Sequence, residues 1–359
     1  MNDNNYCVIL AGGVGLKLWP ASTHHKPKQF IDFLGNGQTL LQATYNRIAR
    51  FVDTDNIIVS TNEEYKDLAL QQLPHIKQEN LLLEPMRRNT LPSATWATLT
   101  IAHRNPEARV LVVPSDQLIL DEDKFEEEVM KAFGYVSETG RILSLGVMPT
   151  RAETNFGYVQ MGERMGHDIY QVKSFTEKPE MEFAKIFMED GEFLWNTGLF
   201  VWKADDFLRL AHEHGEAQFP NFKKTANMIE NGLKMVEIVK NSFSMCPNIT
   251  IERVCLEKME HTDVMLCHFG WTDLGTWHSL YNVMPKQNEN VVMRGMGMLY
   301  DCKGCIVRTP QDKIVILQGL EDYVVVEENN ILVVCKKEDQ NAIRKFVNDV
   351  NISLGDEFI

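Results

Sequence analysis

The first part of the chain, up to about residue 150, alternates short apolar runs with longer segments whose apolar positions recur at helical spacing. Because the short runs are almost wholly apolar, they predict strands of a parallel sheet that is buried on both faces. The predicted strands are Cys7–Leu10, Ile57–Ser60, Leu81–Leu83, Val110–Val113 and Ile142–Val147. The predicted helices are Thr39–Ala49, Tyr65–Leu73, Leu91–His103 and Lys124–Ser137. This alternation predicts an α/β fold.

Three of the predicted strands lead directly into polar runs, namely Gly12–Lys28, Glu84–Thr90 and Pro114–Asp116. Ligands of such sheets bind at the carboxyl ends of the strands, so we expect functional residues in these runs. Thr61 followed by Glu64 also matches a capping box, which predicts that a helix begins near Tyr65.

The rest of the chain has a different texture. From about Arg151 to Pro285, turns rich in Gly, Trp and Asn interrupt the apolar runs, which favours a pocket wall over plain core. From about Asn290, short alternating runs predict a small β module: Cys305–Arg308, Ile314–Leu317, Tyr323–Val326 and Ile331–Val334. The chain then closes with a helix whose apolar stripe is Ile343, Phe346, Val347 and Val350. We predict two domains, residues 1–287 and 288–359.

The overall charge narrows the choice of ligand. The 359 residues carry a formal net charge of -14, which argues against nucleic acid or anionic membranes as main partners. A small anion held by a local cluster of positive charge is therefore the expected ligand. The length is also more than one compact domain usually needs, which agrees with the two predicted domains.

The chain is expected to be cytoplasmic. We see no basic region followed by a long apolar stretch at the N-terminus and no apolar run long enough to span a bilayer. The seven cysteines have no framework spacing, which suits a reducing compartment. Cys302 and Cys305 form a lone CxxC without a matching second pair nearby, so we expect neither a zinc site nor a redox function there.

The stretch Ala11–Phe30, AGGVGLKLWPASTHHKPKQF, concentrates positive charge in this acidic chain. It follows a predicted buried strand and combines three glycines with three lysines, Lys17, Lys26 and Lys28. Glycines in such a position let backbone N–H groups approach a phosphate closely. The stretch is therefore the best candidate for the anion site.

Two familiar phosphate-binding loops do not match this stretch. A dinucleotide fingerprint needs a third glycine where Leu18 stands, and a Walker A loop needs Gly before Lys17 and Ser or Thr after it. From the residues alone, a surface turn with solvated lysines stays open as an alternative. Pro27 stiffens the approach to Lys28 and favours the interpretation in which that lysine points inward.

Gly12–Pro20 (GGVGLKLWP) and Lys26–Phe30 (KPKQF) resemble the signature of the sugar-1-phosphate nucleotidylyltransferases. The Trp-Pro and Pro-Lys-Gln-Phe variants are similar to the mannose-1-phosphate guanylyltransferase branch of that family. Further matching segments follow in order: Glu84–Thr90 (EPMRRNT), Pro114–Asp116 (PSD), Phe175–Pro179 (FTEKP), Trp195–Phe200 (WNTGLF) and Trp271–Trp277 (WTDLGTW). Asp322–Lys336 resembles the short, monofunctional members, so the resemblance covers nearly the whole chain.

The resemblance implies a fold and a reaction. The fold is a Rossmann-like nucleotidyltransferase domain with a mixed, mainly parallel sheet, followed by a small β-rich, β-helix-like domain that ends in a helix. The reaction makes GDP-mannose and pyrophosphate from GTP and α-D-mannose 1-phosphate by direct attack of the sugar phosphate on the α-phosphorus, with Mg²⁺ as cofactor. Nucleic acid and membranes are not expected partners, and a homodimer is left open.

The resemblance also implies roles for particular residues. Those implied for catalysis are Lys17, Lys28, Asp116 and Asp273, of which Asp116 and Asp273 would bind the metal. Those implied for nucleotide binding are Ala11, Gly12, Gly13, Gly15, Lys17, Glu84, Asn89 and Ser115. Those implied for sugar phosphate binding are Gly157, Glu177, Lys178, Asn196 and Gly198.

These residue types suit the chemistry. The nucleophile is already an anion at neutral pH, so the protein must align and neutralise two polyanions rather than supply a general base. Lys17 would sit at the β- and γ-phosphates and Lys28 at the α-phosphate. Glu177 and Asn196 would bind hexose hydroxyls, and Lys178 would reach the sugar phosphate. Mg²⁺ takes oxygen ligands, often one or two carboxylates plus substrate phosphates.

Plainer interpretations exist for the same residues. The lysines could be solvated, Asp116 could cap a turn, and Glu177 with Lys178 could be an exposed charge pair. Which residues read guanine is left open among Glu84, Asn89, Ser115 and backbone carbonyls.

The chain departs from the family pattern at three places. Lys17 stands where the family usually has arginine, Gln117 where histidine is common, and Thr250-Ile-Glu252 where Ser-Ile-Asp is frequent. Two rival functions stay open. One is the same chemistry on other substrates, as in a thymidylyl- or uridylyltransferase acting on glucose 1-phosphate. The other is a catalytically silent regulator that binds nucleotide sugars.

Overall fold

The structure of the chain is a computed structural model. It describes residues 2–215, 227, 237–238, 243–257, 261–337 and 339–359. The chain divides into two compact units. Unit 1 consists of Met1–Gly12, Tyr45–Ser115 and Ile119–Trp271, and unit 2 consists of Gly13–Thr44, Asp116–Leu118 and Thr272–Ile359. The predicted domain boundary at residues 287 and 288 stays a prediction. Among the described helices, none has the length and hydropathy needed to span a membrane.

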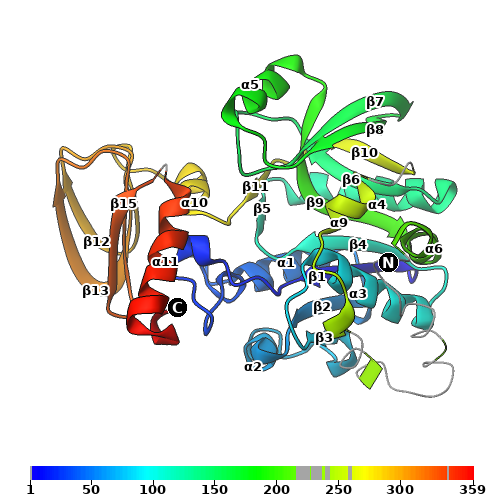
Figure 1. Ribbon diagram of the computed structural model, residues 1–359, viewed down its shortest axis with the longest axis horizontal. Coiled ribbons are helices and arrows are strands. Elements are labelled where there is room, and N and C mark those ends of the chain that lie inside the picture. The colour runs from blue at the N-terminus through cyan, green and yellow to red at the C-terminus, as the bar shows by residue number, and fades with distance from the viewer. Residues whose placement is uncertain (1, 216–226, 228–236, 239–242, 258–260, 338) are drawn as a thin grey trace. The chain divides into compact units, whose positions relative to one another are not determined.

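Unit 1 is built on a nine-stranded mixed sheet with the order β3-β2-β1-β4-β9-β6-β10-β8-β7 (Figure 1). In that order the strands are β3 (Leu81–Glu84), β2 (Ile57–Asn62), β1 (Asn5–Leu10), β4 (Arg109–Pro114), β9 (Phe193–Lys203), β6 (Ile142–Val147), β10 (Thr262–Cys267), β8 (Ile169–Thr176) and β7 (Tyr158–Gly166). β3, β2, β1 and β4 are parallel, as are β6 and β10. Every pairing that involves β7, β8 or β9 is antiparallel.

Helices cover both faces of the parallel strands. The helices are α1 (Leu40–Ile48), which is divided between the two units, α2 (Lys66–Gln72), α3 (Thr90–Arg104), α4 (Glu122–Thr139), α5 (Met181–Asp190), α6 (Ala204–Gly215) and α9 (Ile251–Cys255). Val8 and Val110 share a core cluster with α3, α6 and α9. Asn5 and Arg109, on the opposite face by strand alternation, contact Met130 and Phe133 of α4. The predicted α/β class with a mixed sheet is therefore confirmed.

The predicted strands and helices of this part are confirmed, with bounds shifted by a few residues. The capping box at Thr61 is wrong. β2 continues through Thr61, whose hydroxyl donates to the carbonyl oxygen of Ala11 at 2.8 Å. Asn62 takes the cap instead and accepts from the backbone N–H of Glu64 at 3.1 Å. A buried hydroxyl satisfied by the residue that follows β1 is a long-range feature that local spacing does not reveal. Short 3-10 helices complete the unit: η3 (Thr54–Asn56), η4 (Glu63–Tyr65), η5 (Gln78–Asn80) and η6 (Phe243–Met245).

Unit 2 contains the predicted β module. Its four-stranded sheet has the order β12 (Val291–Tyr300), β13 (Ile306–Gln318), β14 (Tyr323–Glu328) and β15 (Ile331–Lys336). Its helices are η1 (Leu16–Leu18), η2 (Lys28–Phe30), α10 (Trp277–Val283), the terminal α11 (Gln340–Leu354) and η7 (Asp356–Phe358). A separate two-stranded sheet pairs β5 (Gln117–Ile119) with β11 (Trp271–Asp273). The predicted β-rich module ending in a helix is confirmed.

Two strands of the module differ from the sequence-based expectation. The predicted strands Cys305–Arg308 and Ile314–Leu317 are halves of the single strand β13, and β12 was not predicted. The polar segment between the two halves resembles a turn, but parallel pairing with β12 continues past it after an irregularity between Arg294 and Met296. Backbone pairing overrides local composition here.

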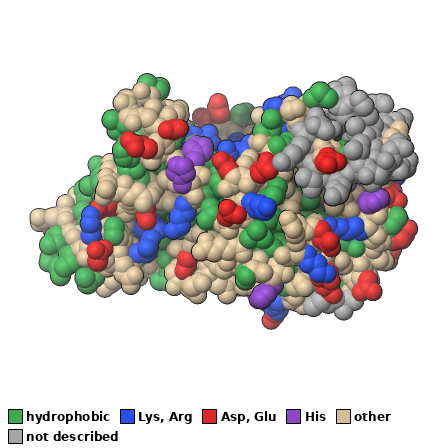
Figure 2. All heavy atoms as spheres, turned by 90° about the horizontal axis from the view of Figure 1, so that it is seen from below, with side chains coloured by type: hydrophobic (Ala, Val, Ile, Leu, Met, Phe, Trp, Pro, Cys, Tyr) green, Lys and Arg blue, Asp and Glu red, His purple; other side chains and the backbone are tan. Residues whose placement is uncertain are grey.

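The second halves of β12 and β13 expose an apolar face. The large hydrophobic side chains that stay more than half exposed on it are Met296, Met298, Tyr300, Ile314 and Ile316. Met296 pairs with Ile314 and Met298 with Ile316, so they form a contiguous row. Hydrophobic side chains gather at this end of the module in Figure 2. A contiguous row of exposed apolar side chains marks a candidate contact surface.

Candidate functional site

Three predicted residues from distant parts of the chain meet in unit 2, and we call them the lysine–aspartate cluster: Lys28, Asp116 and Asp273. Lys28 begins η2, directly after Pro27, and its ammonium forms an ion pair with the Asp116 carboxylate. The backbone N–H of Leu274 donates to the carbonyl oxygen of Asp116 at 2.9 Å, which holds the segment of Asp273 beside Asp116. The structure thus brings these three predicted residues together.

The pKa values in this cluster reflect its burial and its crowded charges. Burial, together with the nearby Asp116 charge, raises the pKa of Asp273 to about 6. Burial works against the charged form of Lys28, but the carboxylates of Asp116 and Asp273 outweigh it and raise the pKa of that lysine. Two carboxylates beside one ammonium leave excess negative charge, which a cation would relieve.

We expect Asp273→Asn to stabilise the metal-free protein at pH 8. The folded pKa of about 6 lies above the ordinary value of an aspartate, so the folded protein disfavours the ionised form of Asp273. The free energy of unfolding therefore falls as the pH rises from about 4 to 6. The asparagine should therefore raise the free energy of unfolding by roughly 1–3 kcal/mol at pH 8 and by very little at pH 4. Urea unfolding in EDTA at both pH values measures this. An equal gain at both, or a loss at pH 8, would contradict the expectation.

The glycine-rich loop shapes the approach to this cluster. Gly15 has a φ of 75°, a left-handed conformation that favours glycine. A Cβ on Gly15 would lie only 2.7 Å from two carbons of the Lys28 side chain, so the lysine stem passes directly over the loop. Lys17 follows in η1 and adds positive charge near Asp273. Gly13 lies between Gly12 and this turn, and a Cβ there would meet no atom within 4 Å.

A second group of predicted residues lies at the carboxyl ends of β1, β2 and β3 in unit 1. The Glu84 carboxylate accepts from the Ser60 hydroxyl at 2.7 Å and lies beside Gly12, where a Cβ would be 3.9 Å from its Oε2. Burial raises the pKa of Glu84, although hydrogen bonds from Ser93 and Ser60 oppose the shift. We call Gly12, Ser60 and Glu84 the glutamate cluster. Ser60 is a member that sequence reasoning missed, although it closes a predicted strand.

The other predicted residues of this region are bound into the backbone network. The N–H of Ala11 donates to Ser60 at 2.8 Å, and the N–H of Ser115 donates to Leu10 at 3.1 Å. Asn89, with a φ of 67°, caps α3 by accepting from the N–H of Thr90. Asn89 therefore acts as the N-cap residue that begins α3.

Arg87 is a further residue that the sequence reasoning did not single out. Its guanidinium pairs with Glu64, contacts the Tyr65 hydroxyl and donates to the carbonyl oxygen of Gly12 at 3.4 Å. It therefore ties the start of the glycine-rich stretch to η4 within unit 1. The sequence feature that could have identified Arg87 is its position within the polar run that follows β3.

The predicted sugar-side residues also meet within unit 1. A Cβ on Gly157 would lie 2.7 Å from the Phe175 ring and 3.0 Å from Oε2 of Glu177, so only glycine leaves room for them. The N–H of Asn196 donates to the carbonyl oxygen of Gly157 at 2.8 Å. The Asn196 Oδ1 accepts from the N–H of Gly198 at 3.2 Å, and Gly198 has a φ of 73°.

Two further contacts complete this group. Lys178 forms an ion pair with Glu177, and both side chains are about half exposed. Glu252, which sequence analysis noted only as a departure from the family pattern, accepts from Asn196 Nδ2 at 3.2 Å. Burial, with the nearby Glu177 charge, raises the pKa of Glu252. We call Gly157, Glu177, Asn196 and Glu252 the hexose-side cluster.

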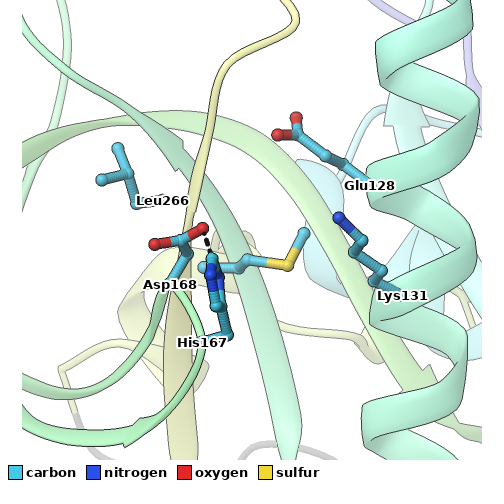
Figure 3. A pocket seen from close by; sticks show the side chains of 6 residues that line it. Glu128, Lys131, His167, Asp168 and Leu266 are labelled. Carbon is cyan, nitrogen blue, oxygen red and sulfur yellow. Dashed lines mark hydrogen bonds and ion pairs between the residues drawn. The ribbon is translucent and has the colours of Figure 1, made fainter.

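A separate pocket of about 250 Å³ lies elsewhere in unit 1 (Figure 3). Its lining residues are Glu128, Lys131, His167, Asp168, Met265 and Leu266. None of these is a predicted site residue, and the His167 ring bonds the neighbouring Asp168 at 2.8 Å. Within the described residues, no group of three or more His, Cys, Asp or Glu could hold a metal ion by itself. We therefore assign the candidate functional residues to the three clusters, one in unit 2 and two in unit 1, rather than to the pocket.

Comparison with known proteins identifies two matching family models. The nucleotidyl transferase model matches residues 6–290, and the model of the MannoseP isomerase/GMP-like beta-helix domain matches residues 297–350. Together they account for most of the chain, including all three clusters.

Individual proteins are similar over nearly the full chain. Mannose-1-phosphate guanylyltransferase RfbM of Salmonella typhimurium is 31% identical over 344 residues, covering 95% of this chain and 71% of that protein. Mannose-1-phosphate guanylyltransferase 2 of Escherichia coli O157:H7 is 31% identical over 363 residues, covering 98% and 74%. The crystal structure of "mannose-1-phosphate geranyltransferase" from Thermus thermophilus has a TM-score of 0.84 at 29% identity, covering 97% of this chain and 99% of that chain.

Proposed function

Because this chain belongs to the nucleotidyl transferase family, we propose that it transfers the guanylyl group of GTP to mannose 1-phosphate and releases pyrophosphate. The similar guanylyltransferases support the choice of substrates. The observation that carries the proposal is the lysine–aspartate cluster, in which one ammonium and two carboxylates from distant segments converge. This is the set of groups that phosphoryl chemistry uses to hold and neutralise polyanions.

In the proposed reaction, an oxygen of the sugar phosphate forms a bond to the α-phosphorus of GTP. The bond from the α-phosphorus to the bridging oxygen of the β-phosphate breaks, and pyrophosphate leaves with that electron pair. The attacking oxygen carries no proton that a base must remove. The protein's contribution is to align the two substrates and to stabilise the charge that grows on the α-phosphate and the leaving group.

The lysines would supply this stabilisation. Lys28 would contact the α-phosphate, and the carboxylates of Asp116 and Asp273 raise its pKa and so favour its charged form. Lys17 would neutralise the β- and γ-phosphates, as a point charge rather than the planar fork of an arginine. Gly13 and Gly15 would let backbone N–H groups approach the triphosphate.

Asp116 and Asp273 would hold Mg²⁺. The donor set fits, since Mg²⁺ takes oxygen ligands and commonly combines one or two carboxylates with substrate phosphates and water. The raised pKa of Asp273 and its proximity to Asp116 indicate excess negative charge that a bound cation would offset. When bound, the ion would act as a Lewis acid toward phosphate oxygens.

We propose that the glutamate cluster binds the base. Guanine presents N–H donors on its pairing edge, and the Glu84 carboxylate is an acceptor that burial keeps away from solvent. The Ser60 hydroxyl holds Oε1 at 2.7 Å and so orients the second oxygen. A buried acceptor that would stay unpaired with another base can reject that base strongly.

We propose that the hexose-side cluster binds mannose. Glu177 and Asn196 would bind hydroxyl groups, with Glu252 orienting the Asn196 side chain through their 3.2 Å hydrogen bond. Lys178 would exchange its pairing with Glu177 for the sugar phosphate. Gly157 and Gly198 would let the backbone approach the ring.

Glu177→Gln should raise the KM for mannose 1-phosphate by roughly tenfold, which is the effect expected from the loss of one charged hydrogen bond. The KM for GTP should stay nearly unchanged. Steady-state kinetics with each substrate varied in turn measures this. The matched control is Glu180→Gln, an exposed glutamate without a side-chain capping bond. Equal losses toward both substrates would instead assign Glu177 to positioning or folding.

Pyrophosphate release with each of four nucleoside triphosphates against mannose and glucose 1-phosphates tests the function itself. We expect turnover with GTP and mannose 1-phosphate. Preference for a pyrimidine triphosphate and glucose 1-phosphate would establish the rival transferase. Binding of GTP without metal-dependent pyrophosphate release would establish the silent regulator.

The proposed assembly is a homodimer, and the proposed location is the cytoplasm. The exposed row on β12 and β13, which includes Met298 and Ile316, supports self-association through the β module. Light scattering of the purified chain tests the assembly directly.

A further inference from the structure

Trp19 lies two residues after Lys17 in the glycine-rich loop, residues 13–30, which we call the phosphate loop. Its indole N–H and its backbone carbonyl oxygen are both hydrogen-bonded. Its indole N–H donates to the carbonyl oxygen of Phe358 at 2.8 Å, and its own carbonyl oxygen accepts from the indole N–H of Trp277 at 3.3 Å. Trp19 and Trp277 are 3% and 2% exposed, so these bonds are shielded from water. All of these residues belong to unit 2. The phosphate loop is therefore bonded to segments more than 250 residues later in the chain.

Apolar contacts follow the same route. Leu18 is fully buried and shares one core cluster with Trp277 and with residues of the terminal β module and helix, which are Ile306, Val324, Ile343, Val347 and Ile359. α11 packs directly against η1, the 3-10 helix that carries Lys17. Phe33 meets the Trp277 ring edge-on at 6.1 Å. The C-terminal module thus supplies the core on which the phosphate loop is folded.

The anchored segment also carries Lys17 and supports the stem of Lys28. The Ser22 hydroxyl donates to the carbonyl oxygen of Val14 at 2.6 Å and closes the turn that contains Lys17 and Trp19. Gly15, within that turn, packs against the stem of Lys28. A displacement of Trp19 would therefore move both lysines, because the turn carries Lys17 and supports the stem of Lys28.

We propose that Trp19 is a positioning residue for the reaction, and that its bonds to Phe358 and Trp277 make the C-terminal module a working part of the GTP site. The inference rests on the proposed function. Trp19 itself touches no substrate in this scheme. It holds Lys17 and Lys28 in the geometry that the triphosphate requires.

Catalysis is sensitive to such positioning. Productive geometry has to be held within about 0.5 Å, and a displacement of about 1 Å can cost on the order of 100-fold in rate. The hexose-side cluster lies in unit 1 and shares none of the anchoring bonds. Loss of the anchor should therefore affect GTP and the chemical step, and leave hexose binding unchanged.

The test is Trp19→Phe, which keeps an aromatic ring but removes the N–H donor. We expect kcat to fall by roughly 10- to 100-fold and Mg²⁺-dependent GTP affinity, measured by calorimetry, to weaken. The KM for mannose 1-phosphate should stay within about twofold of the wild-type value. The matched control is Trp202→Phe in unit 1, whose buried indole N–H donates to the Thr98 hydroxyl at 3.2 Å. We expect the control to lose stability but to keep kcat and GTP affinity.

A second variant tests the inference independently in case Trp19→Phe fails to fold. Trp277→Phe keeps a ring in the core but removes the indole N–H that donates to the Trp19 carbonyl oxygen, and we expect the same pattern of losses. If both variants keep wild-type kcat and GTP affinity, or if Trp202→Phe loses as much as Trp19→Phe, the inference is overturned. An inactive wild-type protein would overturn the proposed function instead, and the GTP-binding comparison would still decide whether the anchor shapes the phosphate loop.

Discussion

Lys28→Met is expected to lower kcat by ~10²–10³, the usual loss when one preorganised electrostatic donor is removed. The lysine is held beside two carboxylates, and its stem passes over Gly15, so its charge is already in place before substrate binds. The loss should appear in kcat more than in the KM for GTP, because negative charge grows on the α-phosphate in the transition state. Pyrophosphate release at saturating substrates measures it.

Lys26→Met is the matched control, because Lys26 lies in the same loop but is exposed. It should keep near wild-type turnover. Lys17→Met should also impair turnover, whereas Lys17→Arg should preserve or improve it, because arginine offers a planar fork to the phosphates. If Lys28→Met turns over as fast as Lys26→Met, the assignment of Lys28 to the α-phosphate is wrong. If Lys17→Arg is inactive, the pocket has been built around lysine and the family role does not carry over to it.

Asp116→Asn and Asp273→Asn should each reduce turnover by roughly 10²–10³ at limiting Mg²⁺, because each removes one of the two carboxylates of the proposed cation site. Both variants should remain folded, and Asp273→Asn should be more stable than the wild type when metal is absent. The rate as a function of Mg²⁺ concentration is the measurement. Higher Mg²⁺ should recover part of the lost rate if the defect is one of metal affinity.

Asp312→Asn provides the control, since Asp312 is an exposed aspartate of β13 in the same unit. Opposite effects on activity and stability at Asp273 would separate a functional role from a structural one. Near-normal turnover of either variant at limiting Mg²⁺ would remove that residue from the proposed metal site.

Local patterns were enough to predict most strands and helices of the first 150 residues and most of the β module. Val110–Val113 could be recognised as a strand because a short apolar run between turn signals is typical of a buried strand. The structure places it in β4. β12 escaped recognition because Arg294, Gly295 and Gly297 interrupt its apolar pattern. That strand exists because β13 pairs with it on both sides of the irregularity, and pairing with a distant segment leaves no local signal.

The sequence by itself determined the class of chemistry. Glycines and lysines after a buried strand, and aspartates in two short turns, are the residue types that phosphate and magnesium require, and their order along the chain identifies the family. Only the tertiary structure decided which of them share a site. Lys28, Asp116 and Asp273 meet, Glu252 joins Asn196, and Trp19 is tied to Phe358 because long-range packing brings distant segments together. Residue spacing carries the chemistry of each segment, whereas the contacts between segments depend on how the whole core packs.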